Sequence, residues 1–262
     1  MIAPLPASSP APLVSVVTPV WNAAGTLGAT LASVRAQSLS DWEHLLIDDG
    51  STDGSAALIA GAVAADPRIR ALATGRNGGA GVARNLGLRA ARGRYIAFLD
   101  ADDRWHPEKL ARQIGFMAAE GHAFSFTAYR RVDGAGRALG TVAVPARVTR
   151  GELLRRNVIG CLTAVYDRAH FGAVEMPEVR RRQDYGLWLR LLESVEAAHG
   201  LPEVLADYRV AAASLSGNKL VAARDTWMLY RRVVGLSLPR AAWYFAHYAA
   251  HGFGSRLTER GP

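Results

Sequence analysis

The segment Arg94-Tyr-Ile-Ala-Phe-Leu-Asp-Ala-Asp-Asp103 decides the fold, because an apolar run passes directly into a cluster of carboxylates. We expect a strand over Arg94–Asp100 that ends in an acidic turn. Three short apolar runs rich in β-branched residues precede it, at Val14–Thr18, His44–Asp48 and Ile69–Ala73. Longer helical patterns lie between these runs, and such alternation predicts βαβ units and a mostly parallel sheet.

Helices are expected between and after these strands. Leu27, Leu31 and Val34 recur at helical spacing, and an Ala-rich helix follows the second strand with Ser51 or Asp53 as its N-cap. The other expected elements are a helix near Ala80–Arg92, a helix from Pro107 to about Glu120, a hairpin of Ala123–Val132 with Ala138–Val144, a strand near Leu162–Tyr166 and a helix over Gln183–Leu192.

Polar, turn-forming residues collect where the predicted parallel strands end, at Pro19–Asn22, Asp48–Asp53 and Asp100–Asp103. In open parallel sheets, ligands bind beyond the carboxyl ends of the strands. We therefore expect one active site at this edge of the sheet.

The tetrad Asp100-Ala-Asp-Asp103 places three carboxylates at one strand end. Because these groups repel one another, a hard cation is the natural compensation, and oxygen ligands favour Mg²⁺ or Mn²⁺. Such a metal would neutralise charge on a departing diphosphate. The alternative is a solvated acidic turn that only ends the strand.

The segment Asp48-Asp-Gly-Ser-Thr-Asp53 is, by itself, typical of an Asx turn with a helix cap. Its position at a parallel strand end favours contact with a nucleotide, because carboxylates there accept hydrogen bonds from a uracil N–H or ribose hydroxyls.

A glycine-rich loop, Arg76-Asn-Gly-Gly-Ala-Gly-Val-Ala-Arg-Asn-Leu-Gly87, lies between a strand and a helix. Glycines let the backbone approach a ligand, and the helix N-terminus favours anions. Read as a dinucleotide fingerprint, the loop has Arg84 where the third glycine belongs and follows the third strand, which argues against a Rossmann oxidoreductase.

Three arginines precede an acid in Arg180-Arg-Arg-Gln-Asp-Tyr185. One interpretation is a capped helix with a basic collar. The other makes Asp184 a general base, since a carboxylate near cations stays ionised. The residues alone leave both open.

The composition is that of a globular protein, with 50% hydrophobic and 21% charged residues. The net charge of +8 suits anionic partners, namely nucleic acid, an anionic leaflet or phosphorylated substrates.

Residues 1–12 lack the basic and apolar regions of a secretory signal and are expected to form a flexible tail. No apolar run is long enough to span a bilayer, which predicts a soluble or peripheral protein. P-loop, HExxH, GxSxG and CxxC motifs are absent, so ATPases, zincins and serine hydrolases lack support.

Residues 221–262 form a basic, aromatic helical extension with Trp227, Tyr230 and Trp243 among its aromatics. It is expected either to pack on the domain as a helical cap or to act as an interfacial helix on the inner leaflet of the membrane.

Together these motifs resemble the family 2 glycosyltransferases. The segments that carry the resemblance stand in the family's order: Val16–Asn22, Ile47–Asp53, Ala83–Gly87 and Tyr95–Asp103. The second half is similar to the small enzymes of teichuronic-acid and capsular or exopolysaccharide synthesis through Ile159–Thr163, Arg182–Tyr185, Tyr208–Val210 and Ser214–Lys219. The resemblance covers about Leu13 to Phe253.

The resemblance implies a GT-A fold over residues 13–220, followed by the helical extension. It also implies a nucleotide-diphosphate sugar donor, usually UDP-linked, inversion at the anomeric carbon, and Mn²⁺ or Mg²⁺ as cofactor. Carried over by position, the donor would be bound by Pro19, Val20, Asn22, Asp49, Gly79, Arg84, Asp100 and Asp102. Asp102 and Asp103 would bind the metal, and Asp184 would be the catalytic base.

The QxxRW signature of processive synthases is absent, so we expect transfer of single sugars. The expected acceptor is a glycan or lipid-linked saccharide, met in the cytoplasm or on the cytoplasmic face of the inner membrane. One rival is a nucleotide-sugar-binding protein without transferase activity, pyrophosphorylase-like or regulatory, but Ala23–Thr26 is not a triphosphate loop. A nucleic-acid-binding module is the other, and the acidic strand ends argue against it.

Overall fold

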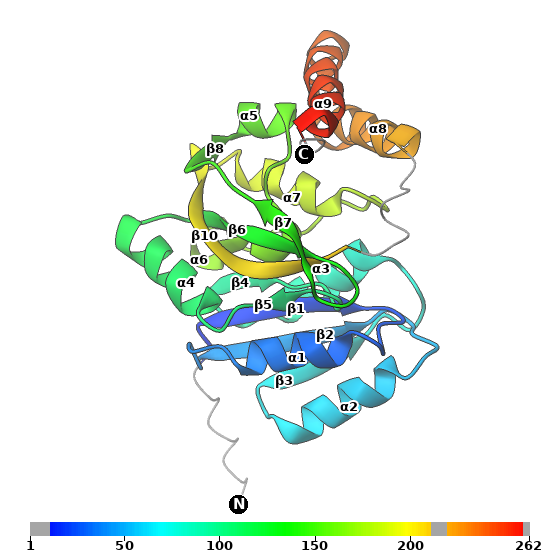
Figure 1. Ribbon diagram of the computed structural model, residues 1–262, viewed down its shortest axis with the longest axis vertical. Helices are drawn as coiled ribbons and strands as arrows, with labels where there is room; N and C mark the ends of the chain where they lie inside the picture. Colours follow the sequence, from blue (N-terminus) through cyan, green and yellow to red (C-terminus); the bar gives the residue numbers. More distant parts are fainter. Residues whose placement is uncertain (1–10, 211–218, 259–262) are drawn as a thin grey trace, which may run out of the picture.

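The structure is a computed structural model that describes residues 11–210 and 219–258 (Figure 1). Of the predicted tail, only residues 11 and 12 belong to this part. Ten strands of the described residues form one sheet. They are β1 (Val14–Val20), β2 (Trp42–Asp48), β3 (Ile69–Ala73), β4 (Tyr95–Phe98), β5 (Arg104–Trp105), β6 (Phe124–Val132), β7 (Ala138–Val142), β8 (Arg147–Thr149), β9 (Val165–Asp167) and β10 (Ala197–Arg209).

Helices cover both faces of this sheet (Figure 1). They are α1 (Leu27–Arg35), α2 (Ser55–Ala65), α3 (Ala80–Ala90), α4 (Lys109–Glu120), α5 (Arg150–Arg155), α6 (Arg168–Phe171), α7 (Gln183–Leu191), α8 (Lys219–Met228) and α9 (Leu238–Thr258). A 3₁₀ turn, η1 (Cys161–Thr163), precedes β9, and a π-helical turn, η3 (Leu229–Val233), follows α8.

The strand order is β3-β2-β1-β4-β9-β6-β10-β5, with β7 beside β6 and β8 beside β10. Strands β3, β2, β1 and β4 run parallel to one another, and β10 runs parallel to β6. Between these two groups, β9 is antiparallel to both β4 and β6. The predicted parallel centre is confirmed, while the whole sheet is mixed.

Strand β1 is buried on both faces, which explains its nearly continuous apolar sequence. Val17 packs in one hydrophobic cluster with residues of α3 and α7. Val14, Val16 and Val20 pack in a second cluster with residues of α1, α2 and α4. The sheet therefore separates two cores and holds β1 at the centre of the parallel group.

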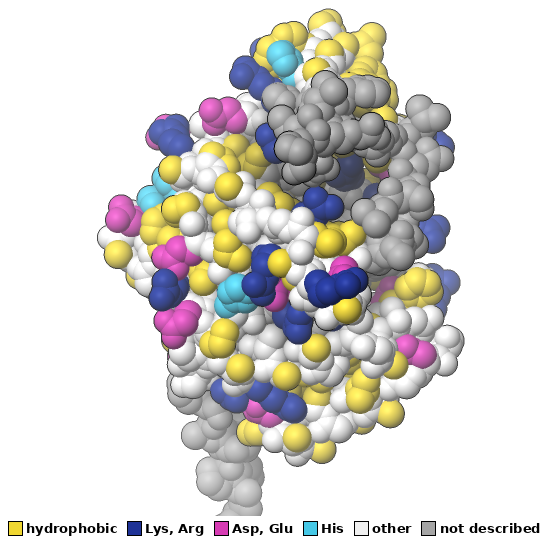
Figure 2. Space-filling view, in the orientation of Figure 1, with side chains coloured by type: hydrophobic (Ala, Val, Ile, Leu, Met, Phe, Trp, Pro, Cys, Tyr) yellow, Lys and Arg dark blue, Asp and Glu magenta, His cyan; other side chains and the backbone are white. Residues whose placement is uncertain are grey.

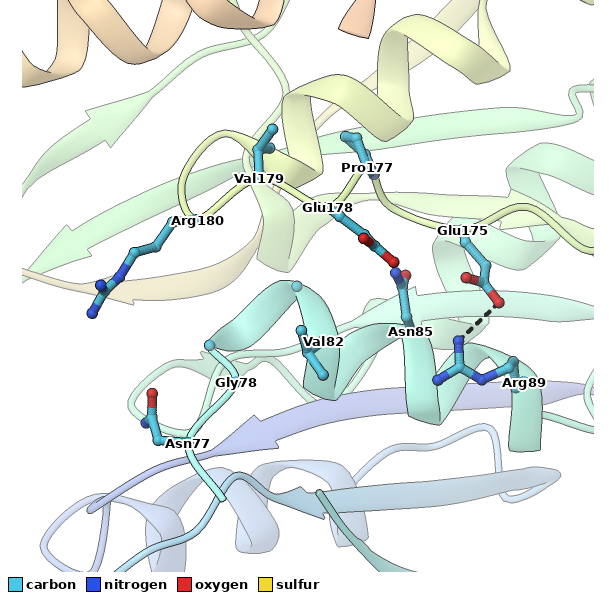
Figure 3. A pocket seen from close by; sticks show the side chains of 12 residues that line it. Asn77, Gly78, Val82, Asn85, Arg89, Glu175, Pro177, Glu178, Val179 and Arg180 are labelled. Atoms are coloured by element: carbon cyan, nitrogen blue, oxygen red, sulfur yellow. Dashed lines mark hydrogen bonds and ion pairs between the residues drawn. The ribbon is translucent and has the colours of Figure 1, made fainter. Parts of the chain in front are cut away.

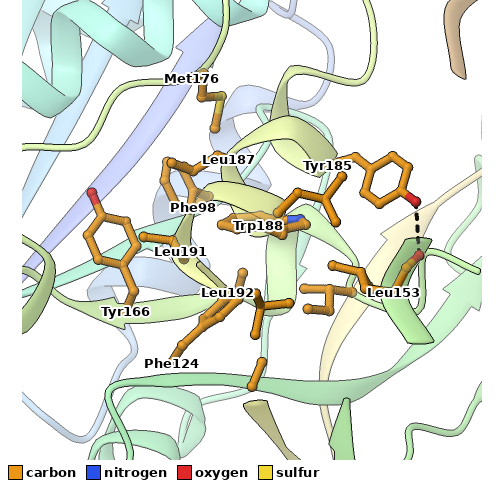
Figure 4. Close-up of a cluster of buried hydrophobic side chains, with 14 of the residues drawn as sticks. Phe98, Phe124, Leu153, Tyr166, Met176, Tyr185, Leu187, Trp188, Leu191 and Leu192 are labelled. Carbon is orange, nitrogen blue, oxygen red and sulfur yellow. Dashed lines mark hydrogen bonds between the residues drawn. The ribbon is translucent and has the colours of Figure 1, made fainter. Parts of the chain in front are cut away.

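The helix that carries Asp184 is fixed by the first of these clusters (Figure 4). Trp188 of α7 is fully buried, and its ring centroid lies 5.6 Å from that of Phe98 and 5.4 Å from that of Phe124. Tyr185 donates a hydrogen bond to the carbonyl of Leu153 at 2.8 Å. Helix α7 is thus anchored to β4, β6 and α5 at once.

The C-terminal extension packs into the same cluster. Leu229, Tyr230 and Ala241 are buried there, and the Tyr230 hydroxyl lies 3.2 Å from that of Tyr185. The extension therefore contributes core to the glycine-loop side of the sheet, and its other face is exposed, with Trp243 47% exposed.

Several elements differ from the sequence expectation, and β5, β8, α5 and α6 are among those that the sequence did not predict. Helix α2 begins at Ser55, whose amide donates to the Asp53 carboxylate at 2.9 Å, while Ser51 accepts from the Asn22 amide instead. The strand expected near Leu162–Tyr166 starts later, because η1 occupies its first half. Strand β10 was not expected at all.

Candidate active site

The ends of β1 and β2 lie level at one edge of the sheet. Val20 pairs with Asp48 in the parallel register, and the Asp49 amide donates to the Val20 carbonyl at 2.8 Å. On the other side of β1, the Leu99 amide donates to the Val17 carbonyl at 3.1 Å, which brings the acidic tetrad after β4 to the same edge. The expected gathering of polar strand ends is confirmed.

Asn22 fastens the loop after β1 to the turn after β2. Its side-chain oxygen accepts from the backbone amide of Thr52 at 2.8 Å, and its backbone amide donates to the Ser51 hydroxyl at 3.1 Å. Asp53 accepts from the Ala24 amide at 3.0 Å. These bonds hold the segment Asp48–Asp53 against the loop that follows β1.

Asp49 shapes the glycine-rich loop. Its carboxylate accepts from the amides of Gly78 at 3.0 Å and Gly79 at 2.7 Å, and from the Thr74 hydroxyl at 2.8 Å. Gly79 has φ +87°, a conformation that favours glycine, and α3 begins directly after it. The loop is therefore preorganised, with the N-terminus of α3 facing the strand ends.

A first cavity of about 600 Å³ lies at this edge. All eight residues expected at a donor line it: Pro19, Val20, Asn22, Asp49, Gly79, Arg84, Asp100 and Asp102. Trp21, Arg180 and Arg209 are among the other residues that line it. The structure thus brings together a set that spans more than eighty residues of sequence.

A second cavity of about 400 Å³ adjoins the first, because Asp100 lines both. Asp103 and Asp184 also line this second cavity, together with Tyr129, Tyr208 and Arg156. Burial, and then the carboxylates of Asp103, Asp102 and Asp100, raise the pKa of Tyr208 to about 12. The shared wall between the cavities is therefore strongly acidic.

Arg84 neutralises part of this acid. Its guanidinium is buried in α3 and forms an ion pair with Asp100, whose side chain is 31% exposed. An arginine cannot lose its proton in such a site, so the pair places one fixed positive charge at the boundary of the two cavities.

Asp102 lines the first cavity and Asp103 the second, and both carboxylates lie close to Asp100 at the boundary. Burial and then the Asp100 carboxylate raise the pKa of Asp102 above its usual value. Burial, followed by Asp100 and Asp102, raises the pKa of Asp103 further. Asp103 accepts from the Arg209 amide at 2.8 Å through Oδ1, while its buried Oδ2 has no hydrogen-bond partner.

These carboxylates fit a hard divalent cation. Their donors are oxygens, their mutual repulsion favours a cation, and Oδ2 of Asp103 is an unsatisfied acceptor. Within residues 11–210 and 219–258, no group of three or more His, Cys, Asp or Glu side chains is arranged to hold a metal alone. A set of two carboxylates is nonetheless sufficient for Mg²⁺ or Mn²⁺ when substrate phosphates supply the other ligands.

Comparison with known proteins identifies the chain. Residues 15–165, more than half of its length, match the family described as Glycosyl transferase family 2. The chain belongs to this family. It is accordingly a glycosyltransferase, and the resemblance read from its motifs is confirmed.

Relatives of this family 2 glycosyltransferase match it almost end to end. TuaG of Bacillus subtilis (strain 168), which carries the name of a teichuronic acid biosynthesis glycosyltransferase, is 42% identical and covers 94% of this chain and 98% of its own. WfgD of Escherichia coli, a UDP-Glc:α-D-GlcNAc-diphosphoundecaprenol β-1,3-glucosyltransferase, is 34% identical and covers 92% of this chain and 93% of its own.

Solved structures share the fold. The structure of S. aureus TarS 1–349 in complex with UDP has a TM-score of 0.67 at 18% identity, covering 92% of this chain and 72% of that one. The mannosyltransferase PcManGT from Pyrobaculum calidifontis, in complex with GDP-Man and Mn²⁺, has a TM-score of 0.66 at 17% identity, covering 96% and 76%. The expected GT-A fold is confirmed.

Several residues around the two cavities were not singled out from the sequence of this glycosyltransferase. Arg209 holds the acidic tetrad, because its amide binds Asp103 and its Nε donates to the Asp102 carbonyl at 3.1 Å. It lies in the quoted Tyr208–Val210 motif, which was the available signal. Tyr129 and Arg156 have no such signal, because they reach the site from an antiparallel hairpin and a helix end.

A third cavity of about 470 Å³ continues from the first across the start of α3 (Figure 3). Asn77, Gly79 and Arg180 line both cavities. At its far end an ion pair of 2.9 Å joins Arg89 to Glu175. Arg180 therefore lies where the first and third cavities meet.

Proposed function

We propose that this protein is an inverting, metal-dependent, non-processive glycosyltransferase that moves one sugar from a UDP-linked donor to a lipid-linked precursor of a surface polysaccharide. One observation carries the proposal. The eight residues expected at the donor line a single cavity, and its wall at Asp100 is shared with the cavity of Asp184.

The first cavity suits a nucleotide diphosphate. Pro19 and Val20 provide an apolar floor beside the carboxylate of Asp49. The amides of Gly78 and Gly79 are already bound by Asp49, so a diphosphate would meet the first amides of α3, which lack intrahelical acceptors. Arg84, Arg180 and Arg209 add positive charge around them.

The second cavity suits the acceptor. Asp184 lies in the first turn of α7, and the rigid packing of Trp188 and Tyr185 fixes that turn. As the acceptor oxygen forms its bond to the anomeric carbon, the bond from that carbon to the diphosphate oxygen breaks. Asp184 takes the hydroxyl proton, and the nucleoside diphosphate leaves on the opposite side, which inverts the configuration.

The charge of the leaving group needs compensation. Asp102 and Asp103 would hold Mn²⁺ or Mg²⁺, which neutralises negative charge on the departing diphosphate when bound. Arg84 is held by Asp100 beside this position. Fixed charges of this kind stabilise a transition state without reorganisation.

The nature of the acceptor is supported by the relatives. WfgD is named for transfer to a diphosphoundecaprenol-linked sugar and TuaG for teichuronic acid biosynthesis. The UDP-linked donor is supported in the same way, since TarS was solved with UDP and with UDP-GlcNAc.

Contact with the cytoplasmic face of the inner membrane is part of the proposal, with residues 13–220 as the catalytic domain and 221–262 as the extension that makes the contact. In the described residues, no helix is both long and apolar enough to cross a bilayer. On α9, Leu238 is 59% exposed, and Trp243, which is 47% exposed, follows Arg240 by one turn on the same side of the helix. Figure 2 shows apolar and basic side chains at this end of the molecule. Apolar and basic residues on one helix face favour an anionic interface.

Calorimetric titration with UDP, with and without Mn²⁺, tests the proposal. We expect binding that Mn²⁺ strengthens, and hydrolysis of one donor in a panel of UDP-sugars. If UDP, GDP and dTDP all fail to bind under either condition, the proposed donor class is wrong and the protein is not a transferase of this kind.

A further inference from the structure

The second cavity does not end at the acidic wall. A smaller cavity of about 240 Å³ adjoins it, since Arg156 and Val158 line both. Arg147 and Arg155 also line this smaller space, which we call the arginine cavity. We call these two adjoining cavities the path from Asp184 to the three arginines.

Two of these arginines form no direct ion pair within the described part of the chain. Arg147 is paired with Glu196 at 2.7 Å. Glu152, the acid of the arginine cavity, is occupied by the amide and hydroxyl of Thr149 at 2.8 Å each. Across the described residues, Arg155 and Arg156 form no ion pair with a carboxylate.

Local structure fixes the position of this charge. Arg156 follows α5 in an extended conformation, and α5 starts with a complete capping box between Thr149 and Glu152. The Arg155 guanidinium lies 4.9 Å from the centre of the Trp243 ring of α9. The capped helix thus sets the backbone at both arginines, and an aromatic ring contacts the Arg155 guanidinium.

The two ends of the path have opposite charge. Asp100, Asp103 and Asp184 stand at one end and would repel an anionic acceptor, while Arg155 and Arg156 stand at the other. A saccharide whose hydroxyl reaches Asp184 would direct its remaining substituent toward Arg156. Arginine binds phosphate oxygens in a bidentate manner, so an anionic substituent of this type matches the second end.

We propose that Arg156, assisted by Arg155, binds a phosphate group attached to the acceptor saccharide. The inference rests on the proposed function, because it takes the second cavity as the acceptor site. The phosphate can belong to a lipid-linked diphosphate or to a soluble sugar phosphate. The exposed Trp243 beside Arg155 provides an apolar surface beyond the phosphate, which favours the lipid-linked form.

Farnesyl diphosphate is a suitable probe, because it presents a diphosphate and an isoprenoid chain without a sugar. Its binding is measured by calorimetry in EDTA with the full chain, the Arg156→Gln variant and the Arg155→Gln variant. Loss of a charge-assisted hydrogen-bond pair to phosphate should weaken binding about tenfold or more in R156Q, and less in R155Q. Inorganic pyrophosphate, measured in parallel, should bind more weakly than farnesyl diphosphate but lose the same factor in R156Q.

Two controls locate the binding. Arg180→Gln removes an arginine of the first cavity, and Arg137→Gln removes one from the exposed β6–β7 hairpin. Arg137→Gln should leave farnesyl diphosphate binding within about twofold of the wild-type value, because Arg137 lines neither cavity of the path to Asp184, and Arg180→Gln reports any diphosphate held in the first cavity. Loss in R180Q with none in R156Q places the diphosphate in the first cavity and overturns the proposal.

The remaining outcomes separate the proposal from the proposed function. Pyrophosphate that binds as tightly as farnesyl diphosphate, with loss in R156Q, supports the phosphate site and overturns the lipid-linked source. A protein that binds UDP but not farnesyl diphosphate has the proposed donor and lacks this site. A protein that binds farnesyl diphosphate through Arg156 but no nucleotide keeps the site and loses the donor.

Discussion

Arg84, which is buried, and Asp100, which is partly exposed, form an ion pair at the boundary between the two cavities. Arg84 comes from the first turns of α3 and Asp100 from the end of β4, so the pair joins the glycine-rich loop to the acidic tetrad. The Arg84 side chain is only 6% exposed. The pair is therefore both a structural contact and the charge balance of the site.

Replacing Asp100 by Asn should reduce the free energy of unfolding by about 2 kcal/mol, because it leaves the Arg84 guanidinium buried without a counter-charge. The value is below that of a fully buried pair, since Asp100 is partly exposed. Urea denaturation at pH 7 measures it. Asp102→Asn is the matched control, with no ion pair, and should change stability by less than about 0.5 kcal/mol. Equal losses in the two variants would contradict the assigned pair.

Replacing Asp184 by Asn should abolish transfer while leaving the affinity for UDP unchanged. The amide cannot take up the proton of the acceptor hydroxyl, and Asp184 lines the second cavity but not the first. The comparison is between product formation in a transfer assay and calorimetric UDP titration of the same preparation. A parallel fall in both quantities would mean that Asp184 supports the fold or the donor rather than the proton transfer.

Removal of the metal should weaken UDP binding in the wild-type protein, and the Asp102→Asn and Asp103→Asn variants should no longer respond to Mn²⁺. Asparagine retains an oxygen that can accept the Arg209 amide at position 103, so the fold is preserved. Calorimetry in Mn²⁺ and in EDTA gives the ratio of affinities. Asp41→Asn, an exposed change far from the site, should keep the wild-type ratio. Metal dependence that survives in both site variants would remove these residues as ligands.

The parallel half of the fold follows from local sequence, because each strand is a short apolar run and each strand end carries its polar residues. The same rule located the first cavity, since strand ends of a parallel sheet must meet at one edge. Strand β10 was not predicted, because Ala197–Arg209 contains Gly200, Pro202 and several charged residues, and its apolar and polar residues do not alternate. Its pairing with β6 shifts register at Leu201/Val204 and again at Val204/Asp207, so bulges absorb the proline.

The second cavity was only partly foreseeable for a related reason. Its walls come from long-range pairing of β6, β7 and β10, and no local pattern states which side chain of an antiparallel hairpin will face Asp184. Helix α5 did have a signal, the capping box of Thr149 and Glu152 before an apolar pair. Arg156, which follows it, could then have been placed at a helix end but not at a cavity.

Replacing Trp243 and Leu238 of α9 by Ala should weaken binding to vesicles of phosphatidylcholine and phosphatidylglycerol by about tenfold or more, since each large apolar side chain contributes about 1.5–3 kcal/mol on burial. Point variants are needed because truncation before α8 would remove Leu229 and Tyr230 from the core. Flotation or sedimentation measures the bound fraction. Leu139→Ala, an exposed leucine on β7, should have no effect. Wild-type protein that does not bind anionic vesicles at low salt would leave α9 as a packing element only.

Stability should fall between pH 7 and pH 5 because of His44. This side chain of β2 is fully buried and lies 2.8 Å from the Thr18 hydroxyl through Nε2. Burial, and then the charge of Arg35, lower its pKa from 6.5 to about 3. In the unfolded chain His44 binds a proton below pH 6.5, whereas in the folded chain it stays neutral down to about pH 3. The stabilisation is therefore complete above pH 6.5 and declines by about 1.4 kcal/mol per pH unit below it.

Urea denaturation of the wild type should consequently show a loss of about 2 kcal/mol between pH 7 and pH 5 from this residue. His44→Gln cannot titrate and should remove that slope, even if it lowers stability at pH 7 by disturbing the packing of β2. The pH range is chosen to stay above the titration of Glu43. Burial raises the pKa of Glu43, but hydrogen bonds from Ser15 and Arg70 to its carboxylate outweigh burial, so the pKa is lowered. His199, which is less buried and also has a lowered pKa, provides the control: His199→Gln should remove a smaller part of the slope. If His44→Gln keeps the full wild-type slope, the imidazole of His44 is accessible to protons in the folded state.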